Sequence, residues 1–77
     1  MTKKLEVMKS KARDALTYAS RRINSKDEVG KLEYARYLGQ YEGIGFLAVY
    51  LLNADEYVLF DQYTVEIMAE LGMDTAN

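Results

Sequence analysis

Cysteine and histidine are both absent from the 77-residue chain. Their absence excludes disulfide bonds and the usual ligands of zinc, iron–sulfur and haem sites. A site made only of carboxylates is still chemically possible, but no closely spaced set of acids resembles a calcium-binding loop. We therefore expect no metal and no cofactor. A chain without cysteine also suits a reducing compartment, and we expect a cytoplasmic protein.

Long hydrophobic runs are absent as well. The longest, residues 44–52, is less than half as long as a membrane-spanning helix. The spacing Gly39-x-x-x-Gly43 is typical of membrane helix dimers, but this run is too short, and Gln40 and Glu42 interrupt it. The basic N-terminus does not reach the apolar stretch that a secretory signal needs. We expect neither a transmembrane segment nor a signal peptide.

Proline is the third missing residue, whereas strong helix formers are plentiful. Apolar residues recur at three- and four-residue steps along three segments, which predicts three helices. We expect these helices at about residues 3–24, 27–52 and 55–71, with residues 74–77 as a frayed tail. The short turns between them favour antiparallel neighbours. The predicted fold is therefore all-α, a small antiparallel bundle of three helices in a single domain, 1–77.

Helix-start and helix-stop signals support these boundaries. Ser25 followed by Glu28 has the form of a capping box, and so does Asn53 followed by Glu56. Gly72 is well placed to end the third helix in the left-handed conformation, with the next residue folding back on the helix. The turns are therefore expected near residues 25 and 53.

Glycine is concentrated in the second helix. Gly39, Gly43 and Gly45 each cost about 0.5–1 kcal/mol relative to alanine, so the helix could break there and give four helices. A buried strand at residues 45–52 is the other alternative, but no other segment supplies a strand to pair with it. Gly43-x-Gly45-x-x-Ala48 also spells a dinucleotide-binding fingerprint. It lacks the preceding strand and the βαβ unit that the motif requires, so we expect no nucleotide site.

From Ile44 onward the second helix is apolar on every side, and such a helix must be covered on every side. A chain of this length buries only about 60% of its unfolded surface, so a partner subunit would stabilise it. We therefore predict a homodimer formed by the C-terminal half of the second helix together with the third. The residues expected in the core and interface are Tyr41, Ile44, Phe46, Val49, Tyr50, Phe60, Tyr63 and Ile67.

Charge is strongly segregated along the chain. Residues 1–26 carry eight basic and two acidic side chains, and residues 27–77 carry two basic and ten acidic ones. The basic face expected to bind a partner comprises Lys3, Lys4, Lys11, Arg21 and Arg22. It could meet acids of the other helices, an acidic protein partner, or the phosphates of a nucleic acid. The acidic pI of about 5.0 weighs against nucleic acid.

Catalytic chemistry has little support, because the side chains that could form a nucleophile–base pair are scattered. We expect no catalytic residue and no enzyme. The leading hypothesis is a non-enzymatic protein-interaction module, such as an adaptor, inhibitor or accessory protein of bacteria or phages, with an unidentified protein partner. The alternative is a nucleic-acid-binding protein that uses the basic first helix. A third hypothesis is a helical bundle similar to bacteriocin immunity proteins, on small size, helical content and expected location alone.

Overall fold

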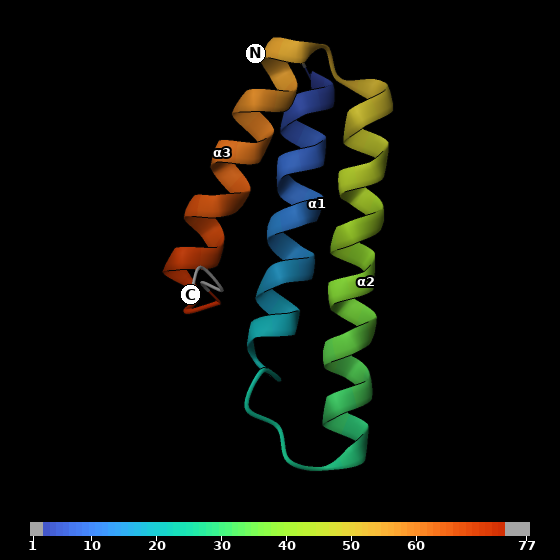
Figure 1. Cartoon of the computed structure of the whole chain (residues 1–77), viewed down its shortest axis with the longest axis vertical. Helices are drawn as coiled ribbons and strands as arrows, with labels where there is room; N and C mark the ends of the chain where they lie inside the picture. The colour runs from blue at the N-terminus through green and yellow to red at the C-terminus, as the bar shows by residue number, and fades with distance from the viewer. Residues whose placement is uncertain (1–2, 74–77) are drawn as a thin grey trace.

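The computed structural model describes residues 3–73, which form three helices and no strand. The helices are α1 (Lys3–Ser20), α2 (Glu28–Leu51) and α3 (Ala54–Glu70). They lie lengthwise beside one another, with α1 between α2 and α3 (Figure 1). α2 and α3 touch little beyond the turn that joins them. The predicted all-α fold of three helices is confirmed, and the predicted tail lies outside the described residues.

α1 packs against both other helices. Its buried residues are Leu5, Met8, Ala12, Ala15, Leu16 and Ala19. These residues recur at the three- and four-residue steps expected of a helix, and half of them are alanine, whose small side chain lets a neighbouring helix come close. The helix ends at Ser20 rather than near residue 24. Arg22 donates its backbone N–H to Ala19, and Ser25 donates to Arg22, so the chain tightens into three-residue turns there.

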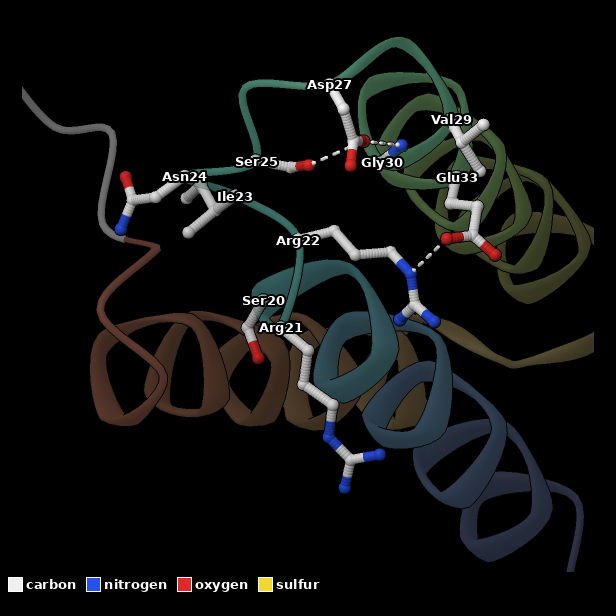
Figure 2. A pocket seen from close by; sticks show the side chains of 10 residues that line it. All are labelled: Ser20, Arg21, Arg22, Ile23, Asn24, Ser25, Asp27, Val29, Gly30 and Glu33. Atoms are coloured by element: carbon white, nitrogen blue, oxygen red, sulfur yellow. Dashed lines mark hydrogen bonds and ion pairs between the residues drawn. The ribbon is translucent and has the colours of Figure 1, made fainter.

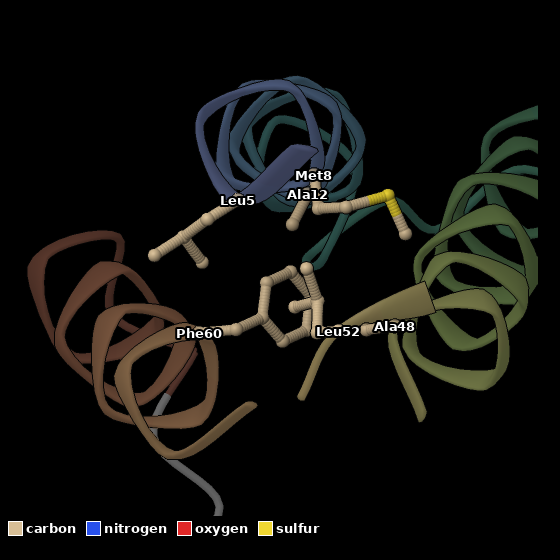
Figure 3. Packing of buried hydrophobic residues seen from close by; sticks show 6 residues of the cluster. All are labelled: Leu5, Met8, Ala12, Ala48, Leu52 and Phe60. Atoms are coloured by element: carbon tan, nitrogen blue, oxygen red, sulfur yellow. The ribbon is translucent and has the colours of Figure 1, made fainter. Parts of the chain in front are cut away.

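The core consists of two apolar clusters that follow α1. The first contains Leu5, Met8, Ala12, Ala48, Leu52 and Phe60, contributed by all three helices and the end of α2 (Figure 3). The second contains Leu16, Ala19, Ile67 and Met73. Tyr41 packs against both clusters. α2 runs unbroken through its glycines, so neither the four-helix alternative nor the strand alternative is correct.

The N-terminal cap of α2 differs from the one predicted. Asp27 is the N-cap, and its carboxylate accepts a hydrogen bond of 2.6 Å from the backbone N–H of Gly30. Ser25 donates its hydroxyl to the same carboxylate at 3.2 Å. The capping box predicted for Ser25 and Glu28 is therefore wrong, because Asp27 satisfies the orphan donor of the first turn.

The signals at the two ends of α3 are confirmed. Asn53 accepts from the backbone N–H of Glu56 at 2.8 Å, and Glu56 accepts from that of Asn53 at 3.0 Å, which completes the capping box. Gly72 has a φ of 72°, the left-handed conformation that glycine adopts without strain. Met73 then folds back and donates its backbone N–H to Met68 at 2.8 Å.

Gly30 is expected to tolerate no side chain. A Cβ at this position would overlap the hydroxyl of Ser25 and lie 2.6 Å from its Cβ. Gly30→Ala should therefore displace the turn that holds the Asp27 cap, and lower the free energy of unfolding by roughly 1–3 kcal/mol in urea denaturation. Gly45→Ala is the control, because a Cβ there meets nothing within 4 Å. It should raise the free energy of unfolding by about 0.5–1 kcal/mol. An equal change in the free energy of unfolding for Gly30→Ala and Gly45→Ala would contradict the explanation by overlap with Ser25.

Candidate interaction surfaces

The C-terminal half of α2 divides its apolar residues between the core and the surface. Ala48 and Leu52 are buried, and Ile44 is half-buried against the first cluster. Phe46 and Tyr50, by contrast, are 71% and 82% exposed. Because neighbours two residues apart point about 200° apart on a helix, these two rings lie on the side of α2 that faces away from the core. The described chain leaves that side open.

The same side of α2 is apolar or small at most positions, and its charged exceptions are Glu28, Lys31 and Glu42. We define the outer α2 face as Leu32, Ala35, Gly39, Gly43, Phe46, Val49 and Tyr50, all of which are exposed. At about 100° per residue they fall within one third of the helix circumference. A continuous exposed face of this kind, with two aromatic rings at one end, is typical of a protein interaction surface.

The predicted core and interface residues separate into three groups. Phe60 and Ile67 are buried, Tyr41, Ile44 and Tyr63 are half-buried, and Phe46, Val49 and Tyr50 are exposed. Phe60 and Ile67 each belong to one cluster of the chain's own core. Neither is therefore free to contribute to a surface.

The predicted basic face is divided as well. Its exposed members are Lys3, Lys4, Lys11 and Arg21. Arg22 instead reaches α2, where its Nε donates to a carboxylate oxygen of Glu33 at 2.8 Å (Figure 2). Its Nη1 also donates to the carbonyl of Tyr18 at 3.0 Å. The hydrogen bond to Glu33 is the main reason that the pKa of Arg22 is raised above its usual value. This side chain therefore joins the end of α1 to α2.

Tyrosine rings support several of the basic side chains. Tyr18 stacks on Tyr37 with ring centroids 5.3 Å apart. The guanidinium groups of Arg21 and Arg22 lie over these two rings, at 5.3 and 5.2 Å from their centroids. These contacts were not predicted from the sequence, although the spacing of Tyr18 and Arg21 places them on one helical side. Part of the basic charge is thus packed against the chain itself.

Tyr63 of α3 plays the same part on the other side of α1. Its hydroxyl accepts a hydrogen bond of 3.1 Å from Arg13, and the ammonium group of Lys9 lies 4.6 Å from its ring centroid. Tyr63 was predicted for the core and interface. It is half-buried and packs against the second cluster, and its ring and hydroxyl also join α3 to Lys9 and Arg13 of α1.

A hollow of about 430 Å³ lies at the turn between α1 and α2 (Figure 2). Four of its polar side chains are already paired, since Ser25 donates to Asp27, which caps α2, and Arg22 donates to Glu33. The hollow is therefore a consequence of how the turn packs. Elsewhere in residues 3–73, no cluster of three or more Asp, Glu, His or Cys side chains is arranged to hold a metal ion.

None of the helices in the described part of the chain is both long and apolar enough to cross a membrane. Comparison with protein-family models, with curated proteins and with solved structures finds no match. The outer α2 face and the predicted basic face are therefore the two candidate interaction surfaces of the described residues.

Proposed function

We propose that the protein is a non-enzymatic interaction module and that it forms a homodimer through the outer α2 face. In this proposal the three antiparallel helices of one chain form the bundle, and a second copy of the chain covers the side of α2 that the bundle leaves open. The observation that carries it is the exposure of Phe46 and Tyr50 on a helix whose opposite side fills the core. Large aromatic residues are enriched at the centres of protein interfaces, and water is a poor environment for them.

Nucleic-acid binding through α1 is the second candidate. Lys3 and Lys4 favour it, because they are exposed at the positive end of the α1 dipole, where basic residues are mildly unfavourable without an anionic ligand. The pairing of Arg22 with Glu33 and the stacking of Arg21 on Tyr18 weigh against it, since they engage two of the five predicted basic residues within the chain.

Light scattering at about 50 and about 500 mM salt, with and without a short duplex DNA, separates the two candidates. We expect a particle of about twice the 8.8 kDa chain mass at both salt concentrations, unchanged by DNA. An apolar interface is little affected by salt, whereas phosphate contacts weaken by orders of magnitude over this range. A monomer, or a DNA complex that dissociates at high salt, would rule out the homodimer as the working form.

A further inference from the structure

We infer that the outer α2 face binds the same face of a second copy, with the two α2 helices antiparallel and the two-fold axis at Gly39. This inference rests on the homodimer proposed above and specifies its geometry. In a two-fold dimer one surface must complement itself. Two pairs of residues in or beside the outer α2 face have this property about Gly39.

The residues on either side of Gly39 match in pairs. Seven positions away in the two directions are Leu32 and Phe46, both apolar and exposed. Three positions away are Arg36 and Glu42, which carry opposite charges. In an antiparallel pair with its axis at Gly39, each residue lies level with the residue that is equally far from Gly39 on the other copy. Leu32 would then face the Phe46 ring of the second copy.

The two charged residues favour the antiparallel arrangement specifically. Arg36 and Glu42 are exposed, and neither forms an ion pair within residues 3–73. Each lies about 4.5 Å along the helix from Gly39. The antiparallel pairing therefore places Arg36 level with Glu42 of the second copy, twice in the dimer. A parallel pairing would instead place like charges level with each other.

The shape of the outer α2 face agrees with the charges of Arg36 and Glu42 beside it. Gly39 and Gly43 lie near the middle, and a Cβ at either position would meet nothing within 4 Å in the chain. Their small size is therefore not required by the packing of the monomer. A second helix that crosses here could approach to about 8 Å between the axes, while the larger Leu32 and Phe46 fill the space on both sides. A different protein partner would not require α2 to be symmetric about Gly39, which is why we assign the face to a second copy.

Single-cysteine variants test the position of the axis, because the chain has no cysteine of its own. We expect Gly39→Cys to form a disulfide-linked dimer readily under mild oxidation, since two residues on the axis are within the roughly 7 Å Cα separation that a disulfide allows. Ala35→Cys is the matched control on the same exposed face. Its two copies would be about 12 Å apart along the helices, so it should link at least about tenfold more slowly.

A mixture of two variants gives a second, independent readout. Ala35 and Gly43 are each four residues from Gly39. Mixing Ala35→Cys with Gly43→Cys should therefore yield mainly the mixed disulfide. If the particle is dimeric by mass but Gly39→Cys does not link, or links no faster than Ala35→Cys, the antiparallel register is wrong although the homodimer remains. If the wild-type particle is monomeric by mass, the proposed homodimer fails first, and the register fails with it.

Discussion

Replacing Phe60 with alanine is expected to lower the free energy of unfolding by about 3–5 kcal/mol. The Phe60 side chain is only 3% exposed, and it lies in the cluster to which all three helices contribute (Figure 3). Its removal leaves a cavity that Leu5 and Leu52 cannot fill unless the helices move. A domain of this length has a total stability of only about 4–12 kcal/mol, so the substitution should remove a quarter of that stability or more.

The matched control is Phe46→Ala, which removes the same atoms from the only other phenylalanine. Because Phe46 is exposed in the monomer, its own contribution to folding should be below about 0.5 kcal/mol. Urea unfolding followed by circular dichroism at two protein concentrations separates the two effects. A loss through dimer contacts depends on concentration, whereas a loss in the core does not. Equal losses in the two variants, independent of concentration, would contradict the assignment of Phe60 to the core.

The fold could be predicted wherever the determining interaction is local. The apolar residues that recur at three- and four-residue steps along α1 are buried up to Ala19, and the capping box of Asn53 and Glu56 needs only four consecutive residues to form. The start of α2 was less predictable for a physical reason. Ser25 and Asp27 are both good capping residues, and only the path of the turn decides which oxygen reaches the N–H of Gly30.

The division of α2 between core and surface could not be predicted in the same way. The helical period does place Ala48 on one side with Tyr41 and Ile44, which pack in or against the core. Because the helix is apolar on every side, however, the period does not reveal whether Phe46 is covered or exposed. That choice depends on α1, which lies between the other two helices and leaves one side of α2 uncovered. The ion pair of Arg22 with Glu33 is likewise a consequence of tertiary structure, since the two residues are on different sides of the turn.

Phe46→Asp is expected to weaken the proposed homodimer by at least about a hundredfold. In the antiparallel arrangement Phe46 of each copy lies against Leu32 of the other, so one substitution removes a contact at both ends of the interface. It also places an unpaired carboxylate where each apolar contact had been, which carries a desolvation cost. The monomer should remain folded because position 46 is exposed. Dilution experiments by light scattering measure the dissociation constant, and far-UV circular dichroism checks the helices.

Val65→Asp is the control that separates a specific contact from a general effect of charge. Val65 is an exposed apolar residue of α3 and is not part of the outer α2 face. Both substitutions add one negative charge to each chain, so electrostatic repulsion between two acidic subunits would weaken both dimers alike. We expect Val65→Asp to keep the dimer mass and Phe46→Asp to lose it. Two outcomes would contradict the proposal: both variants remain dimers, or both dissociate equally. Either would show that Phe46 is not at the contact and that the outer α2 face does not hold the two copies together.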